Sequence, residues 1–303
     1  MKPRPLWELS VTVASEAEDA ASELLQRLFS TPASSYLDFK SGKAQVALMF
    51  TQPPVFGRQE REAILHGLER LRDFGLEPGR PAIRMRALRP ADWAEAWKRH
   101  FKPISIGSRL LIKPGWDRTR PRTGQAVITL DPGLSFGTGQ HPTTLFCLRE
   151  ITRAAGARAR ARSLLDIGTG SGILAIAAAK LGYTTVSAMD FDPQAVGTAR
   201  ANARRNHVQR RIRITRGDIG KFPTRGGPRY DVVCANLIST LLIAQRERIL
   251  NRAAPGGFVV LAGILATEFE AVRRAYEAAG CELLRSRVQR EWESGAFRCA
   301  ARD

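Results

Sequence analysis

Cysteine, aromatic residues and long apolar runs are all scarce in this chain. Its four cysteines lie far apart and form no Cys-x-x-Cys pair, so the sequence predicts neither a zinc site nor a disulfide framework. No apolar run reaches the roughly 18 residues that a membrane helix needs, and the first residues lack the apolar stretch of a signal peptide. We therefore expect a cytoplasmic protein with reduced thiols and no bound metal.

Acidic residues are also few compared with basic ones. Lys and Arg number 47 against 29 Asp and Glu, which gives a formal net charge of +18. The excess is concentrated from Arg153 to Arg216, and the stretches 158–162 and 204–216 predict a positive surface that attracts RNA or the ribosome. Alternatively, these arginines decorate an ordinary solvated face, since no aromatic residues are interleaved with them for base stacking. The sequence leaves both interpretations open.

The length of 303 residues predicts two domains. Residues 1–88 show the order β-α-β-β-α-β, which is typical of a ferredoxin-like α+β fold. A capping box at Ser15–Glu18 is predicted to start the first helix. Residues 89–125 are predicted to form a linker helix, at 90–101, and connecting strands, one of them near 105–112.

Residues 126–303 are predicted to form the second domain. From Ser163 onward, strand and helix patterns alternate, which predicts a doubly wound, Rossmann-like α/β sheet. One of its helices is expected at 239–252. The last two apolar runs, 281–289 and 296–300, predict an antiparallel hairpin at one edge of this sheet.

A glycine-rich segment, Leu165–Gly172, lies between a predicted strand and a predicted helix, where open α/β sheets bind ligands. Its Gly-x-Gly-x-Gly spacing differs from the dinucleotide fingerprint, which favours a nucleoside with an amino-acid tail over a pyrophosphate. Asp190 ends the next strand, 22 residues after Gly168, and is placed to bind ribose hydroxyls. Its alternative role is a helix cap, but Asp192, directly before Pro193, fits that position better.

Polar residues also end the third and fourth predicted strands. Asn236 ends the fourth strand and is followed by Leu-Ile-Ser at 237–239, with no proline or aromatic ring to clamp a planar nitrogen. The loop therefore favours an aliphatic amine as the acceptor, while a plain turn role for Asn236 remains the alternative. Asp218 follows the third strand, where a polar side chain would meet an adenine amino group.

The most specific motif is the segment 130–144, which reads LDPGLSFGTGQHPTT. It closely resembles the signature that precedes the cofactor loop in the PrmA family of ribosomal protein methyltransferases. Shorter resemblances run through most of residues 90–303, at Asp92-Trp93, Trp97, Pro114–Trp116, Asp190–Pro193, Ala235–Leu237 and Glu291-Trp292. The family's Asn-Ile-Leu-Ala stretch is Asn-Leu-Ile-Ser at 236–239 here, a departure at the acceptor pocket.

The resemblance implies a class I S-adenosylmethionine-dependent enzyme that methylates amino groups, lysine side chains and/or the N-terminal amine, of large-subunit ribosomal protein eleven. It also implies that a ferredoxin-like amino-terminal domain recognises this substrate. The implied cofactor contacts are Thr144, Gly168, Asp190 and Asn236, with Asp166, Gly170 and Asp218 as weaker candidates. Asn236 is also expected to orient the acceptor amine. The rival functions are an RNA methyltransferase and a non-catalytic ribosome-associated binding module.

The start of the helix after this motif has its own chemistry. Pro142 suits the first turn of a helix, so Thr143 and Thr144 are expected near its amino end, where N–H groups and hydroxyls hold a carboxylate such as that of methionine. His141 precedes this helix. We interpret it as a cap or packing residue in preference to a catalytic base.

Overall fold

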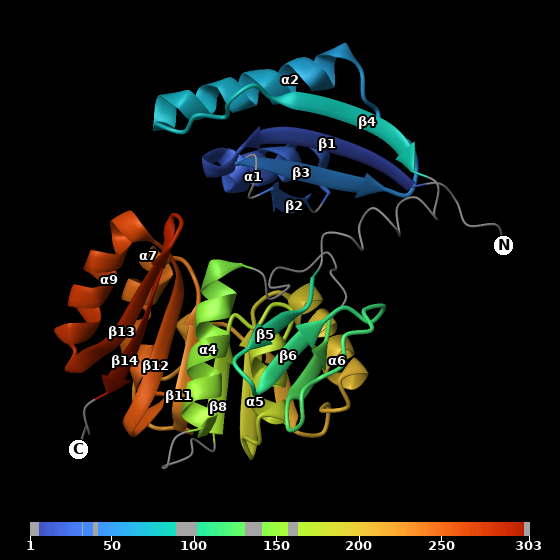
Figure 1. Ribbon diagram of the computed structural model, residues 1–303. Helices are drawn as coiled ribbons and strands as arrows, with labels where there is room; N and C mark the ends of the chain where they lie inside the picture. The colour runs from blue at the N-terminus through green and yellow to red at the C-terminus, as the bar shows by residue number, and fades with distance from the viewer. Residues whose placement is uncertain are drawn as a thin grey trace. The chain divides into compact units, whose positions relative to one another are not determined.

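The computed structural model describes residues 6–31, 33–38, 42–88, 102–130, 141–156 and 163–299. The chain divides into two compact units, residues 1–101 and 102–303 (Figure 1). Within the described residues, no helix has the length and apolar character to cross a membrane. Three predicted features lie outside the described residues: the linker helix 90–101, most of the motif 130–144 and the basic stretch 158–162.

The smaller unit has the predicted order β-α-β-β-α-β. Its elements are β1 (Leu6–Ala14), α1 (Glu18–Phe29), β2 (Ala33–Asp38), β3 (Lys43–Phe50), α2 (Arg58–Glu69) and β4 (Ala82–Leu88). The strands pair antiparallel in the order β2-β3-β1-β4. Alternate residues of β1, Leu9 and Val11, point into a core with Leu25 of α1 and Ile64 of α2. The helices therefore cover one face of the sheet, which confirms the ferredoxin-like arrangement.

The predicted capping box at Ser15–Glu18 is wrong. A 3₁₀ turn at Ser15–Ala17 precedes α1, and no side chain caps either start. The Ser15 N–H donates instead to the Gly42 carbonyl at 3.1 Å. Glu18, which was expected to reach back to Ser15, accepts a 2.6 Å hydrogen bond from the Ser35 hydroxyl. The Ser15 N–H thus bonds to the turn before β3, and the Glu18 carboxylate bonds to β2.

The larger unit contains a seven-stranded sheet in the order β10-β9-β8-β11-β12-β14-β13. Its strands are β8 (Ser163–Ile167), β9 (Thr185–Asp190), β10 (Ile212–Arg216), β11 (Tyr230–Asn236), β12 (Ala253–Leu265), β13 (Cys281–Gln289) and β14 (Trp292–Cys299). The first five are parallel, and β14 pairs antiparallel with both β12 and β13. The doubly wound sheet and its antiparallel edge hairpin are both confirmed.

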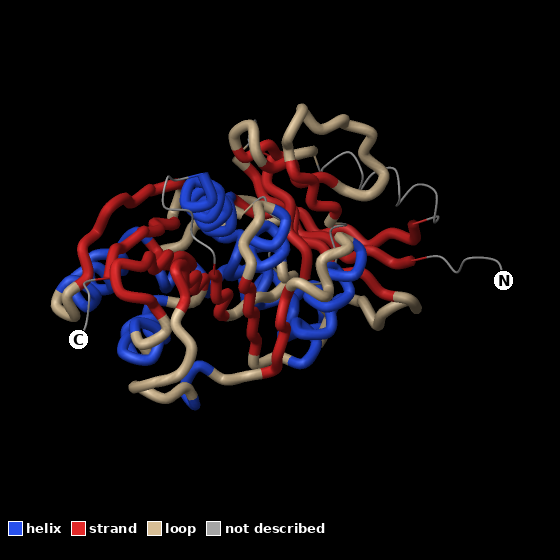
Figure 2. Tube along the Cα trace, turned by 90° about the horizontal axis from the view of Figure 1, so that it is seen from below, coloured by secondary structure: helices blue, strands red, loops and turns tan. Residues whose placement is uncertain are grey.

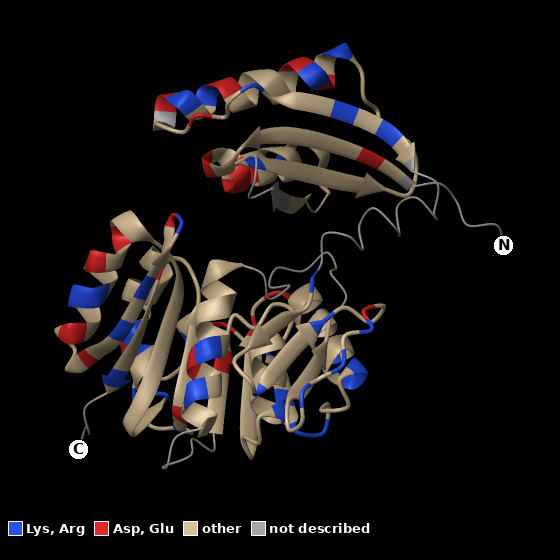
Figure 3. Cartoon of the chain, in the orientation of Figure 1, with Lys and Arg blue, Asp and Glu red and all other residues tan. Residues whose placement is uncertain are grey.

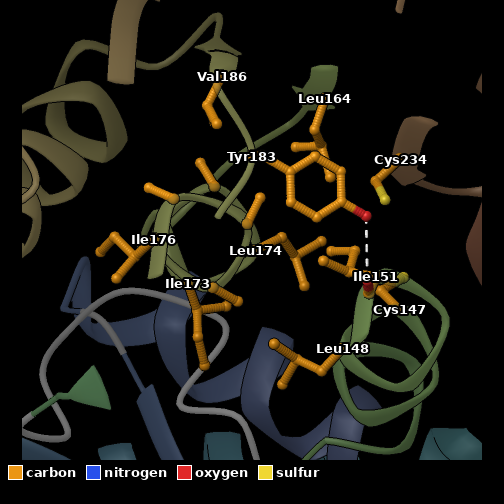
Figure 4. Close-up of a cluster of buried hydrophobic side chains, with 14 of the residues drawn as sticks. Cys147, Leu148, Ile151, Leu164, Ile173, Leu174, Ile176, Tyr183, Val186 and Cys234 are labelled. Atoms are coloured by element: carbon orange, nitrogen blue, oxygen red, sulfur yellow. Dashed lines mark hydrogen bonds between the residues drawn. The ribbon is translucent and has the colours of Figure 1, made fainter. Parts of the chain in front are cut away.

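Helices cover both faces of this sheet, and Figure 2 shows them on either side of its strands. One core lies under α4 (Pro142–Gly156), α5 (Ile173–Lys180) and α6 (Pro193–Arg205), and the other lies under α7 (Ser239–Ala244), α8 (Arg246–Leu250) and α9 (Ala266–Glu277). The first core is drawn in Figure 4, where the buried Tyr183 hydroxyl donates to the Ile151 carbonyl at 3.0 Å. This bond satisfies the only polar atom of the Tyr183 side chain.

Two predicted elements are each divided in the structure. The helix expected at 239–252 is interrupted at Gln245, where φ is −102°, and becomes α7 and α8. The strand expected near 105–112 becomes β5 (Ile104–Ile106) and β6 (Leu110–Lys113), with Gly107 at φ +55° in the turn between them. Together with β7 (Ala126–Thr129), these strands form a separate three-stranded sheet.

The strand order reverses between β8 and β11, because the chain runs outward through β9 and β10 and then returns to the other side of β8. Such a switch point leaves a crevice at the carboxyl ends of the two strands. Ile167 and Ala235 are register partners there. Gly168 and Asn236 follow them directly, so the fold brings the start of the glycine loop beside the end of β11.

Candidate active site

The glycine loop after β8 depends on residues without a Cβ. Gly168, Gly170 and Gly172 have φ angles of +72°, +53° and +82°, a region that L side chains rarely adopt. A Cβ on Gly168 would also lie 2.7 Å from Leu237 Cδ2, and one on Gly172 would lie 3.0 Å from Ala199 Cβ. The glycines thus permit both the turn and the close approach of its neighbours.

Asp190 supports this loop from the end of β9. Its Oδ2 accepts a hydrogen bond from the Gly170 N–H at 2.9 Å, and its Oδ1 accepts one from the Asp192 N–H at 3.1 Å. Asp192 itself caps α6 by accepting from the Gln194 N–H at 2.8 Å, with Pro193 in the first turn. The prediction that Asp192 and not Asp190 caps α6 is confirmed. The prediction that Asp190 binds the ribose stays a prediction.

Asp166 lies one residue before the end of β8 and is buried. Its Oδ2 accepts a 2.6 Å hydrogen bond from the Thr169 hydroxyl, whereas its Oδ1 is buried without a geometrically good hydrogen bond among the described residues. Burial raises the pKa of this carboxyl to about 6. The Thr169 hydroxyl and the Ala175 backbone N–H oppose that change, and the negative charge of Asp190 adds to it. A cation beside Asp166 Oδ1 would therefore stabilise the ionised carboxylate.

The amino end of α4 carries a second group of buried polar side chains. Thr143 and Thr144 lie in its first turn, and Thr144 Oγ1 is buried with no hydrogen-bond partner among the residues that the structure describes. The Thr143 hydroxyl hydrogen-bonds to His141 Nδ1 at 2.7 Å. The His141 ring meets the Trp292 ring edge-to-face, with centroids 5.1 Å apart. Burial, helped by the charge of Arg290, lowers the pKa of His141 to about 4, so the imidazole is neutral at pH 7.

Asn236 also carries a buried side-chain oxygen, Oδ1, that has no hydrogen-bond partner in the described part of the chain. The backbone beyond it is held by β12, since the Leu237 N–H donates to the Ala262 carbonyl at 2.9 Å. Ser239, at the start of α7, donates its hydroxyl to Glu268 Oε2 at 2.6 Å. The loop after β11 is thus anchored on both sides of Ile238, whose side chain is 66% exposed.

Asp218, the remaining predicted contact, has a local structural role. It is exposed at the end of β10 and caps a 3₁₀ turn by accepting from the Gly220 N–H at 2.8 Å. A side chain that caps a turn retains free acceptor capacity. Its predicted contact with adenine therefore stays a prediction.

Two residues of the site were absent from the sequence-based candidates. Thr169 orients Asp166, and Gly263 on β12 packs against Asn236. Gly263 has φ +81° and lies where the pairing of β12 with β14 shifts between Leu261 and Ile264. An isolated glycine inside a strand pattern indicates such a bulge, so this signal was available in the sequence.

Three buried oxygens in this region have no hydrogen-bond partner among the described residues, namely Thr144 Oγ1, Asp166 Oδ1 and Asn236 Oδ1. They border the carboxyl ends of β8 and β11 or the start of α4. The family model described as "Ribosomal protein L11 methyltransferase (PrmA)" matches residues 5–299. The chain belongs to the PrmA family. It is therefore an S-adenosylmethionine-dependent methyltransferase, and its substrate is ribosomal protein L11.

Individual members of the PrmA family are similar to this chain in sequence and structure. The ribosomal protein L11 methyltransferase of Trichlorobacter lovleyi is 41% identical over 227 residues, covering 74% of this chain and 73% of that protein. The one of Geotalea uraniireducens is 38% identical over 220 residues, covering 70% and 69%. The crystal structure of the ribosomal protein L11 methylase of Lactobacillus delbrueckii subsp. bulgaricus superposes with a TM-score of 0.58 at 28% identity. It covers 65% of this chain and 98% of that one.

Proposed function

We propose that this chain transfers methyl groups from S-adenosylmethionine to free amines of ribosomal protein L11, namely lysine side chains and/or the N-terminal amine. The observation that carries the proposal is the buried, unpartnered Oδ1 of Asn236 beside the glycine loop. A buried acceptor without a donor costs stability, and an amine N–H supplies the missing donor. The loop after Asn236 has no aromatic ring or proline to grip a planar nitrogen.

Each candidate cofactor residue suits a different chemical group of S-adenosylmethionine. Asp190 would bind the ribose hydroxyls, with lone pairs that its two backbone donors leave free. The Thr144 hydroxyl and the amino end of α4 suit the methionine carboxylate. Asp166 suits the methionine ammonium group, because a cation offsets the cost of its buried charge. Gly168 and Gly170 would let the loop backbone approach the ligand, and Asp218 would meet the adenine.

S-adenosylmethionine supplies an electrophilic methyl group on a sulfonium, and the chain aligns the acceptor with it. Asn236 Oδ1 and the Leu237 carbonyl oxygen both lie within 3 Å of the Cβ position of Gly263, so the two acceptors are close to each other. Together they would orient an amine whose lone pair points at the methyl group. They would also stabilise the positive charge that develops on the nitrogen during transfer.

The amine must be neutral before it attacks. A lysine side chain has an ordinary pKa near 10.4 and an α-amine one near 7.7–8.0. Burial beside the sulfonium lowers the pKa of the acceptor by desolvation and by like-charge repulsion. The proton then leaves to solvent before transfer. His141 is not needed as a base, since burial already depresses its pKa to about 4.

We further propose that the smaller unit recognises the protein substrate. In this proposal residues 1–88 form the substrate-recognition domain, residues 89–125 connect it, and residues 126–303 form the methyltransferase domain. In support, every candidate cofactor residue from Thr144 to Asn236 belongs to the larger unit. The smaller unit has its own hydrophobic core around Leu9, Leu48 and Ile64. Because it contains none of the candidate cofactor residues, we assign substrate recognition to it.

Our second proposal is that a positively charged surface of the larger unit contacts ribosomal RNA. Residues 193–229, over α6, β10 and the loop beyond, contain one acidic residue, Asp218. All their basic side chains are exposed: Arg200, Arg204, Arg205, Arg210, Arg211, Arg213, Arg216, Lys221, Arg225 and Arg229. Figure 3 shows blue segments along α6. Because β10 is an edge strand, these cations border an open side of the sheet, where phosphates can approach.

The decisive experiment incubates the full chain with radiolabelled S-adenosylmethionine and ribosomal proteins, with and without ribonuclease. We expect label in L11 under both conditions, and mass spectrometry should locate it on amines. Because Asn236 is proposed to act on the acceptor amine, Asn236→Ala should bind the cofactor but transfer methyl groups slowly. A loss of cofactor affinity would instead make Asn236 the cofactor contact that the family resemblance implies. Label in ribosomal RNA that disappears with ribonuclease would instead make the chain an RNA methyltransferase, and bound cofactor without any transfer would make it a binding module.

A further inference from the structure

Two glycines from different elements lie close to Asn236 and Leu237. A Cβ on Gly168 would lie 2.7 Å from Leu237 Cδ2, the end of a side chain. A Cβ on Gly263 would lie 2.8 Å from the Leu237 carbonyl oxygen and 2.9 Å from Asn236 Oδ1. The carbonyl oxygen belongs to the backbone, which moves less readily than the end of a side chain. A side chain at position 263 therefore cannot fit without displacing the Leu237 carbonyl or turning the Asn236 side chain.

The space at Gly263 matters because Asn236 Oδ1 has no hydrogen-bond partner among the described residues. The atoms packed against this oxygen therefore help to set its direction. The backbone of Leu237 is held by the Ala262 carbonyl, next to Gly263, and cannot retreat without losing that 2.9 Å bond. A methyl group at position 263 would thus turn the Asn236 carboxamide or displace the Leu237 carbonyl.

We propose that Gly263 is a positioning residue for methyl transfer, acting through Asn236 Oδ1 and the Leu237 carbonyl oxygen. The inference rests on the proposed function, in which these oxygens orient the acceptor amine. The three atoms nearest to the Cβ position of Gly263 belong to Leu237 and Asn236. Because Asn236 is proposed to orient the acceptor amine, the effect of Gly263 is expected on the transfer step and not on cofactor binding.

The chain offers a matched control in the same strand. Gly256 also lies on β12 and has φ +71°, close to the +81° of Gly263, yet a Cβ there would meet no atom within 4 Å. Alanine at either position meets a similar positive φ, which L side chains rarely adopt. Only alanine at 263 intrudes on Asn236 and Leu237. A difference in kcat between the two variants therefore reports the contact with Asn236 and Leu237 and not the positive φ that both positions share.

The test compares Gly263→Ala with Gly256→Ala in the full chain, using L11 as substrate. We expect Gly263→Ala to lower kcat by about 10- to 100-fold, the effect of a reacting group displaced by up to about 1 Å. Its affinity for S-adenosylmethionine, measured by calorimetry, should stay close to that of the parent. Gly256→Ala should keep the parental kcat. A Gly263→Ala variant with parental kcat overturns the proposal.

A double variant separates positioning from a general structural role. If Gly263 acts through Asn236, the Asn236→Ala/Gly263→Ala enzyme should be about as slow as Asn236→Ala, whereas additive losses contradict the proposal. If Asn236→Ala itself keeps the parental kcat, the proposed role of Asn236 fails, and this failure is distinct from that of Gly263.

Folding is controlled with asparagine, which tolerates positive φ better than alanine does. Gly263→Asn keeps the intruding Cβ, so it should reproduce the loss in kcat while melting close to Gly256→Asn. If both Gly263 variants fail to fold while both Gly256 variants fold, position 263 serves the fold and not the reaction, and the proposal is overturned.

Discussion

The Gly170 N–H donates a hydrogen bond of 2.9 Å to Oδ2 of Asp190, across the 20 residues that separate the glycine loop from the end of β9. The side chain proposed to bind the ribose thus also fixes the loop on which the rest of the cofactor would lie. Cofactor binding and loop geometry therefore depend on one carboxylate. Two residues farther on, Asp192 has only the local role of capping α6.

The first prediction compares these two carboxylates. Asp190→Ala should weaken S-adenosylmethionine binding by about 1.5–3 kcal/mol, the range for hydrogen bonds to a charged group. Asp192→Ala, its matched control, should lower the free energy of unfolding by about 1 kcal/mol through the lost helix cap and leave cofactor affinity unchanged. Calorimetry measures both. Parental affinity in a folded Asp190→Ala variant would remove Asp190 from the site.

The second prediction concerns pH and Asp166. Its pKa is about 6 in the folded chain against an ordinary value of 3.8, so the protonated form favours folding. Its stabilising contribution, about 3 kcal/mol for a shift of about two units, is complete below pH 3.8 and is lost as pH rises through about 6. The unfolding free energy of Asp166→Asn relative to the parent should therefore increase over that window and then level off.

Denaturant titrations at a series of pH values measure this difference. Saturating S-adenosylmethionine should reduce it, because the ligand's ammonium group would stabilise the ionised Asp166. A difference that stays constant from pH 4 to 7 would show that the Asp166 carboxyl titrates normally. Thr169→Val serves as a control, since it removes the hydroxyl that bonds to Asp166 but keeps the carboxyl.

The third prediction concerns His141, which lies against Trp292. Because its pKa is about 4, its imidazole does not change charge near neutral pH. His141→Gln should keep the rise of the methylation rate between about pH 6 and pH 9, which reflects loss of a proton from the acceptor amine. It should lower the unfolding free energy by about 0.5–1.5 kcal/mol through the lost ring contact. A flattened pH–rate profile would instead identify His141 as the base.

The fourth prediction concerns the smaller unit. Removing residues 1–101 should leave S-adenosylmethionine binding intact, because the candidate cofactor residues and their supporting cores lie in residues 102–303. It should abolish methylation of intact L11. Circular dichroism checks that the shortened chain is folded, and calorimetry checks cofactor binding. Full activity toward L11 would locate substrate recognition in the larger unit.

The fifth prediction concerns the positive surface over α6 and β10. Arg210→Gln/Arg213→Gln should weaken binding to a ribosomal RNA fragment and reduce the slope of log affinity against log salt by up to about 1.8. The matched control, Arg273→Gln/Arg274→Gln on α9, removes the same charge from residues that both bond to Glu270. Fluorescence anisotropy at several salt concentrations gives the slopes. Equal slopes for the two double variants would mean that the arginines only decorate a solvated face.

The sequence by itself determined the order of elements in both units, and it supplied most of the residues proposed for the site. Strand and helix periods, the glycines of the loop at Gly168 and the Asp192-Pro193 helix start all act over a few residues. The segment 130–144 added the family, although most of it lies outside the described residues. Even the divided helix at Gln245 kept its place between β11 and β12.

Only the tertiary structure decided which distant groups meet. Gly263 lies beside Asn236 because β11 and β12 pair there, and Trp292 reaches His141 because the edge hairpin returns toward α4. The Ser15–Glu18 box failed for the same reason, since Ser35 and Gly42 compete for its groups. Burial, and with it the raised pKa of Asp166, depends on packing between strands and helices that no local pattern specifies.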